Sequence, residues 1–66
     1  MRNQWINFYT GYVEVRAQGS TVEQFVNALV RNKVPIWDMK RESEASILFS
    51  VSLRHVSTIR RVLRRY

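Results

Sequence analysis

Residues 45–53 read ASILFSVSL, and this stretch decides the fold that the sequence predicts. Apolar side chains alternate there with serines and Leu48, a period of two that is typical of a strand with one face in a core. The polar residues 41–44 (RESE) before it are short enough to connect a hairpin to an extended segment over 34–41. We therefore expect residues 34–53 to form two antiparallel strands.

The extended segment 34–41 does not show which of its faces is buried. Either Val34 and Ile36, or Trp37 and Met39, point to the core, and the alternation does not choose between the two pairs. Trp37 and Lys40 differ in parity, so a regular strand does not project both of them outward.

A strand and a helix are expected before this hairpin. Residues 12–17 alternate, with Val13, Val15 and Ala17 on one face. A turn at residues 18–19 follows, and Ser20 and Glu23 have the spacing of a capping box, so the helix should begin at Thr21. Its apolar residues have helical spacing and lie on one side of the helix; they are Val22, Phe25, Val26, Leu29 and Val30.

The two ends of the chain are expected to be helical. Trp5, Phe8 and Tyr9 stand at i, i+3 and i+4, which predicts a short helical turn ended by residues 10–11. Ser52 is the expected N-cap of a last helix. The apolar side of that helix consists of Leu53, Val56, Ile59, Val62, Leu63 and Tyr66.

These elements predict one small α+β domain over residues 1–66, in the order strand, helix, strand, strand, helix. We expect a two-layer sandwich in which a three-stranded antiparallel sheet, with strand 45–53 in the middle, carries both helices on one face. A chain of this length buries only about 60% of its unfolded surface, which leaves room for one modest core. The chain has no cysteine, which excludes disulfides and thiolate metal sites, and its longest apolar run is far shorter than a membrane span, so we expect a soluble fragment.

Positive charge is concentrated near the end of the sequence. The formal net charge is +6, and the last thirteen residues hold five arginines and no carboxylate. The candidate anion- or partner-binding residues are Arg54, Arg60, Arg61, Arg64 and Arg65. Nucleic-acid phosphates, anionic lipid headgroups and an acidic protein surface are the partners that such a cluster attracts. The structural alternative is a solvated face, in which the helix dipole accounts for one or two of the arginines.

The sequence offers no catalytic, cofactor-binding or metal-binding residues. His55 is the only histidine, and we expect it to pack or to cap a helix; the five carboxylates lack the spacing of a metal site or of paired acids. We therefore expect a domain that is not an enzyme and needs no cofactor.

Two further binding modes follow from the aromatic residues and from the sheet. A surface for single-stranded RNA combines aromatic and basic residues on an open sheet face, and the residues that could form one here are Tyr12, Arg16, Trp37 and Lys40. We expect the large aromatics to fill the core or cover the sheet instead; these are Trp5, Phe8, Tyr9 and Trp37. An open face or edge of the sheet would also allow a homo-oligomer.

The sequence also resembles a known family. Read as W..F..GYV.V...G.....F.N over residues 5–27, then IW..KR at 36–41 and VSL at 51–53, it is similar to the N-terminal segment of the YqfD family of stage IV sporulation proteins. The resemblance implies a longer membrane protein of endospore-forming bacteria, from which this chain is an excised cytoplasmic N-terminal domain. The five arginines would then lie on the cytoplasmic side, near an anionic membrane face.

The function expected on these grounds is a non-catalytic interaction domain of a YqfD-like sporulation membrane protein. Its basic C-terminal helix would face the membrane surface or an acidic protein partner. The alternative is a small nucleic-acid-binding module, because a charge of +6 on a short chain also suits phosphates.

Overall fold

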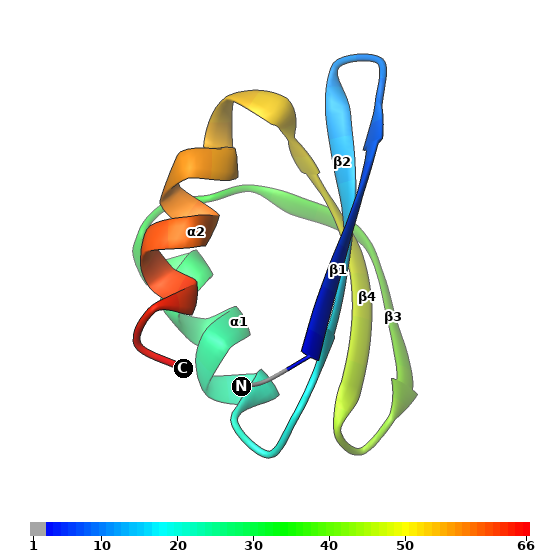
Figure 1. The fold of residues 1–66 in the computed structure, drawn as a ribbon, viewed down its shortest axis with the longest axis vertical. Coiled ribbons are helices and arrows are strands. Elements are labelled where there is room, and N and C mark those ends of the chain that lie inside the picture. Colours follow the sequence, from blue (N-terminus) through cyan, green and yellow to red (C-terminus); the bar gives the residue numbers. More distant parts are fainter. Residues whose placement is uncertain (1–2) are drawn as a thin grey trace.

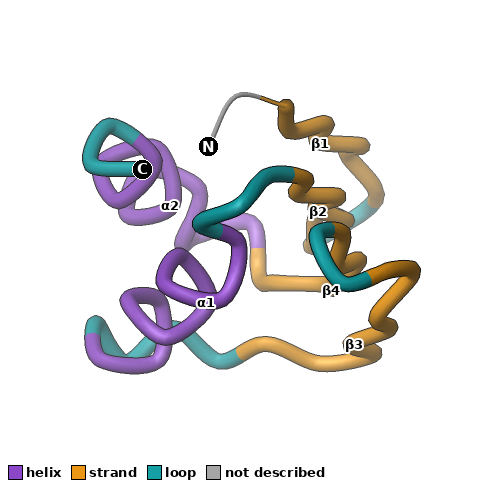
Figure 2. The backbone as a smooth tube through the Cα atoms, turned by 90° about the horizontal axis from the view of Figure 1, so that it is seen from below, coloured by secondary structure: helices purple, strands orange, loops and turns teal. Residues whose placement is uncertain are grey.

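A computed structural model describes residues 3–66 as two layers, a four-stranded sheet and a pair of helices (Figure 1). Both helices lie on one face of the sheet, and its other face is open (Figure 2). The elements in chain order are β1 (Asn3–Tyr9), β2 (Tyr12–Gln18), α1 (Val22–Arg31), β3 (Ile36–Ser43), β4 (Ser46–Ser52), the 3₁₀ turn η1 (Leu53–His55) and α2 (Val56–Leu63).

The strand order in the sheet is β1-β2-β4-β3, and all neighbouring strands are antiparallel. β4 lies between β2 and β3, as predicted for residues 45–53. Val13 pairs with Val51 and Val15 pairs with Phe49, so the buried faces of the two central strands are in register. The prediction of an α+β sandwich with helices on one face is confirmed, but the sheet has four strands where three were expected.

The extra strand is β1, and the prediction of a helical turn near residues 5–9 is wrong. Phe8 pairs with Val13 and Tyr9 with Tyr12, across a tight turn in which Gly11 has a φ of 83°. One helical turn closes few hydrogen bonds, whereas pairing with β2 provides partners along the whole segment. The element order therefore becomes strand, strand, helix, strand, strand, helix.

The core lies between the sheet and the helices. Phe25 of α1 and Phe49 of β4 meet at its centre, with ring centroids 6.3 Å apart. The predicted helix stripe is confirmed except at its last position, because Val30 is exposed and Ala28 is buried instead. The fully buried larger side chains are Phe25, Phe49, Leu29, Ile59, Val13, Val15, Val22 and Val51.

Both helix starts differ from the prediction. α1 begins at Val22, and its N-cap is Thr21, so the predicted capping box, with Ser20 as the cap and Glu23 as its partner, is wrong. Thr21 makes no side-chain capping hydrogen bond. Ser52 leads into η1 rather than into a regular helix, and α2 begins at Val56. The tighter 3₁₀ turn carries Leu53 out of the buried stripe, and its side chain is 45% exposed.

The register of β3 is set by an irregularity. Val34 is buried and Ile36 packs against the core, so this pair, and not Trp37 with Met39, is the one that faces the core. The pairing shifts between Trp37 and Lys40, where Asp38 adopts a φ of 52°. This bulge turns both Trp37 and Lys40 to the open face, which a regular strand would not do.

Candidate anion-binding site

The five arginines singled out from the sequence are all exposed, on and around α2. Arg54 lies in η1, Arg60 and Arg61 lie within α2, and Arg64 and Arg65 follow its last residue. α2 is anchored by Ile59 and Val62, which are buried against the core. The arginines are thus carried by a packed helix and the turn after it.

Successive residues of a helix are rotated by about 100°, and this rotation divides four of the arginines into two rows. Arg61 and Arg65 lie on the side of Val62, which faces α1. Arg60 and Arg64 lie on the other side of the buried stripe. The single cluster expected from the sequence therefore becomes two separate surfaces.

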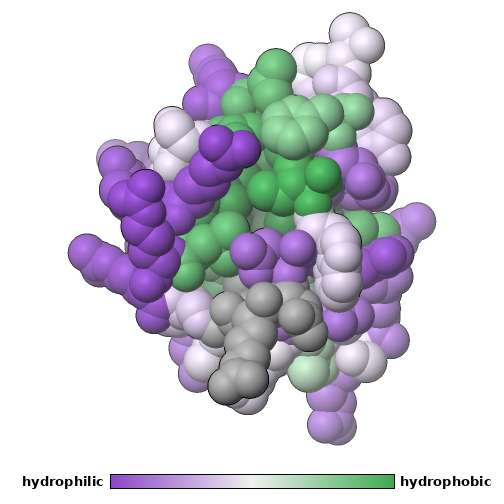
Figure 3. All heavy atoms as spheres, in the orientation of Figure 1, coloured by the Kyte–Doolittle hydropathy of each residue, from purple (hydrophilic) through white to green (hydrophobic). Residues whose placement is uncertain are grey.

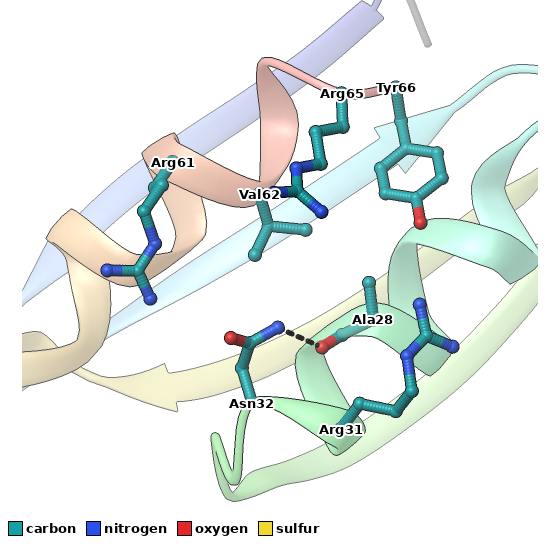
Figure 4. A pocket seen from close by; sticks show the side chains of 7 residues that line it. All are labelled: Ala28, Arg31, Asn32, Arg61, Val62, Arg65 and Tyr66. Carbon is teal, nitrogen blue, oxygen red and sulfur yellow. Dashed lines mark hydrogen bonds between the residues drawn. The ribbon is translucent and has the colours of Figure 1, made fainter.

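The row that faces α1 forms one wall of a pocket (Figure 4). Arg31, in the last turn of α1, forms the opposite wall; its guanidinium lies on the Tyr66 side of the gap between the helices, that of Arg61 lies on the Asn32 side, and Arg65 is between them. The remaining lining residues are Ala28, Asn32, Val62 and Tyr66. We call this the arginine pocket; its volume is about 140 Å³, roughly ten times the minimum that one water needs.

No Asp or Glu side chain lines the pocket. Between residues 3 and 66 the ion pairs join Arg16 to Glu42 at 2.9 Å and Arg41 to Glu23 at 2.7 Å, and neither involves an arginine of the pocket. Asn32 donates its side-chain N–H to the carbonyl of Ala28 at 2.7 Å, so this amide is committed to the end of α1. The three guanidinium groups keep their donors for an external acceptor.

Such an arrangement suits an oxyanion. A guanidinium presents several N–H donors in one plane and binds a phosphate or carboxylate through two of them. Three of these groups line the same pocket, so an anion held there has several N–H donors in its surroundings. The dipole at a helix C-terminus favours each nearby cation by about 0.3–1 kcal/mol, which explains a basic last turn. It does not explain why arginines from two helices line the same pocket.

Arg31 was not among the residues predicted from the sequence. It stands more than twenty residues before the predicted cluster, and only the packing of α1 against α2 brings it to Arg61 and Arg65. Arg54 is not part of the pocket, and neither are Arg60 and Arg64. A basic residue in the last turn of the first helix was the available signal.

The open face of the sheet has a different character. Tyr9 stacks on Tyr12 at 5.0 Å between centroids, and Tyr12 meets Trp37 at 6.2 Å, so aromatic rings cross β1, β2 and β3. Below them is a hollow whose lining includes Glu14 and Lys40. Trp5, Phe8, Tyr9 and Trp37 are all about half exposed, so they do not fill the core. Trp5, Tyr9 and Trp37 cover the open face of the sheet, the other arrangement expected, and Phe8 lies on the helix side of β1.

Charges on this open face nearly cancel. Arg16 is held in a two-point contact by Glu42, at 2.9 and 3.1 Å, and Lys40 shares its hollow with Glu14 and Asp38. The ring cluster of Tyr9, Tyr12 and Trp37 and the unpaired arginines therefore lie on different sides of the molecule. A surface for single-stranded RNA needs both on one side.

Other features of the chain add no second chemical centre. His55 is half-buried in the N-cap position of α2, makes no side-chain capping bond, and has a buried Nε2 without a hydrogen-bond partner. In the part of the chain that the structure describes, no three acidic, histidine or cysteine residues group as metal ligands. Neither α1 nor α2 has the length and apolar character of a membrane span.

Comparison with known proteins assigns the chain to a family. The family model described as "Putative stage IV sporulation protein YqfD" matches residues 7–66. The curated "Uncharacterized protein YqfD" of Bacillus subtilis (strain 168) is 32% identical over 62 residues, which cover 94% of this chain and 15% of that protein. No solved structure is significantly similar. With nearly its whole length matched, the chain belongs to the YqfD family of sporulation proteins.

Proposed function

We propose that this chain is a non-catalytic interaction domain of a YqfD-type sporulation protein and that it binds an anionic membrane surface through the arginines around α2. The observation that supports this most is that Arg31, Arg61 and Arg65 line one pocket that no Asp or Glu side chain lines. A lipid phosphate is an oxyanion, the class of group that guanidinium donors bind.

An extended anionic surface fits the distribution of charge better than one small ligand does. Arg60 and Arg64 lie outside the arginine pocket, on the other side of α2, so cationic side chains flank the helix on both sides. Each Lys or Arg near an anionic bilayer contributes about 1 kcal/mol of attraction. The family resemblance, which implies a protein anchored in a membrane, would hold the domain next to such a surface. An acidic protein partner remains the competing version of this proposal.

Co-sedimentation with vesicles tests the proposal. The chain should bind vesicles that contain phosphatidylglycerol and should bind vesicles of phosphatidylcholine alone much more weakly. R61Q/R65Q should lower the partition coefficient for anionic vesicles by at least about tenfold, since two charges are lost. The matched control is R16Q/K40Q, which removes the same net charge from the open sheet face and should change binding much less.

Equal binding to anionic and neutral vesicles would overturn the proposal, and so would equal losses in the two double variants. If the chain does not bind anionic vesicles but binds an acidic protein, the proposal of an acidic protein partner would be favoured.

The nucleic-acid module stays the second candidate, because the +6 charge favours phosphates of any origin. Binding to duplex DNA should then fall with salt, with a log–log slope of about −0.9 per neutralised phosphate. The separation of aromatic rings from arginines argues against a single-stranded RNA site. Tight, salt-dependent DNA binding without vesicle binding would reverse the ranking of the two candidates.

A further inference from the structure

The side of α2 that faces β1 carries an uncovered apolar surface. β1 is an edge strand, and half of its side chains point towards the helix layer. Phe8, on that side, is 58% exposed, although its partner Val13 is fully buried. The helices thus cover the central strands and leave part of β1 open.

This surface continues from β1 onto η1 and α2. Leu53 is 45% exposed, and its backbone N–H donates to the carbonyl of Gly11 in the β1–β2 turn at 3.2 Å, which holds it near the same end of the hairpin as Phe8. Figure 3 shows a band of apolar side chains between β1 and α2, with hydrophilic side chains beside it over α2. We call the band the apolar stripe; it consists of Ile6, Phe8, Leu53, Val56 and Leu63.

Arginines border the apolar stripe. Arg60 and Arg64 lie on the flank of α2 that adjoins Val56 and Leu63, and Arg54 follows Leu53 directly. None of the three has a carboxylate partner among the ion pairs of residues 3–66. An apolar band bordered by cations matches the boundary of an anionic bilayer, where phosphates lie directly above acyl chains.

We infer that the apolar stripe inserts into an anionic bilayer, with Phe8 and Leu53 entering the acyl region while Arg54, Arg60 and Arg64 bind headgroup phosphates. This inference rests on the proposed function. It adds how deeply the domain enters the bilayer and which residues reach the acyl region. Binding through arginines alone would leave the domain on the headgroups, whereas insertion removes apolar surface from water.

The first experiment measures partition onto phosphatidylglycerol-containing vesicles for Phe8→Ser and Leu53→Ser. Each variant should bind about tenfold more weakly than the unmodified chain. This is the loss expected when about half of a large apolar side chain is no longer removed from water. The matched control is Met39→Ser, because Met39 is also exposed, at 48%, but lies on β3 at the opposite edge of the sheet. Circular dichroism confirms that each variant is folded.

Salt separates insertion from simple charge attraction. In about 1 M salt the Debye length is only about 3 Å, so attraction between arginines and headgroups is largely screened. The unmodified chain and Met39→Ser should retain measurable binding there, and the combined variant F8S/L53S should lose it. Complete release of the unmodified chain at this salt concentration would overturn insertion.

A spectroscopic readout gives the depth directly. Phe8→Trp, combined with Trp5→Phe and Trp37→Phe, places the only indole at position 8. Lipids brominated along the acyl chain should quench its fluorescence on anionic vesicles, and aqueous iodide should quench it less than in the free chain. If anionic vesicles bind the chain but neither quenching nor the serine variants show an effect, insertion is wrong and the proposed function stands. If anionic vesicles do not bind the chain at all, both fail.

Discussion

Lys33 shows how one residue can carry backbone strain in a helix end. It follows the C-cap of α1 with a φ of 60°, a conformation that costs residues other than glycine roughly 1–2 kcal/mol. Its N–H donates to the carbonyl of Val30 at 2.9 Å, and the N–H of Val34 donates to that of Leu29 at 3.0 Å. This is a Schellman ending, closed by the buried side chains of Leu29 and Val34.

Lys33→Gly should therefore stabilise the domain. We expect the free energy of unfolding in urea to rise by about 0.5–1 kcal/mol, because glycine reaches this φ without a steric penalty but loses more entropy on folding. Lys33→Ala is the matched control: it removes the same charge, keeps the strain, and should show no comparable gain. Equal stabilisation in both variants would mean that the charge, not the backbone, is responsible.

Arg31 is the residue that distinguishes the arginine pocket from a merely basic helix. Inorganic phosphate, compared with chloride at equal ionic strength, should raise the melting temperature, because a ligand that binds only the folded state stabilises it. At a phosphate concentration about ten times the Kd the gain is about 1.4 kcal/mol, which corresponds to several degrees in a domain of this size.

Arg31→Gln should abolish this shift, and Arg54→Gln, which removes one arginine outside the pocket, should preserve it. Differential scanning calorimetry measures both. An unchanged shift in Arg31→Gln would show that the anion binds elsewhere.

Among the elements, β1 and β3 are the ones that the sequence analysis described incorrectly. The i, i+3, i+4 spacing of Trp5, Phe8 and Tyr9 is helical, but pairing with β2 decides the conformation, and that pairing is a contact between segments. The bulge at Asp38 could not be predicted from the alternation of apolar and polar residues either, because it is a shift in the pairing of β3 with β4. β2, α1 and β4 were predictable because their buried faces follow strict periods. Arg31 was missed because its role depends on packing between helices.

The position of β1 at the edge of the sheet has a measurable consequence. It pairs only with β2, and its helix-facing residues Ile6 and Phe8 are not fully buried. We expect the hydrogen-bonded amides of β1 to exchange with solvent before those of β4, which lies between two strands and under the helices. Hydrogen exchange followed by NMR tests this, and the amides of β2 that pair with β4 serve as the internal reference. Equal protection in β1 and β4 would contradict it.

On the scale of the whole molecule, charge is divided between the two layers. Glu14, Asp38, Glu42 and Glu44 belong to the sheet and its hairpin, whereas the helix layer contains Glu23 as its one carboxylate among residues 3–66. The field of such a molecule orients it, with the helix layer towards an anionic surface and the open sheet face away from it.

Trp37 should report this orientation. It lies on the open sheet face, on the strand farthest from β1. In Trp5→Phe, iodide should quench Trp37 fluorescence to a similar extent in free chain and in chain bound to anionic vesicles. Strong protection of Trp37 on vesicles would show that the sheet face, not the helix layer, contacts the bilayer.

The bulge in β3 also determines which layer receives Arg41. In an unbroken alternation after Trp37, Arg41 would project from the open sheet face; the additional residue turns it under α1, where its guanidinium meets Glu23 at 2.7 Å. The one acidic side chain of the helix layer is thereby neutralised by a residue of the other layer. A single inserted position in an edge strand thus gives Glu23 a cationic partner at the end of α1 away from the arginine pocket.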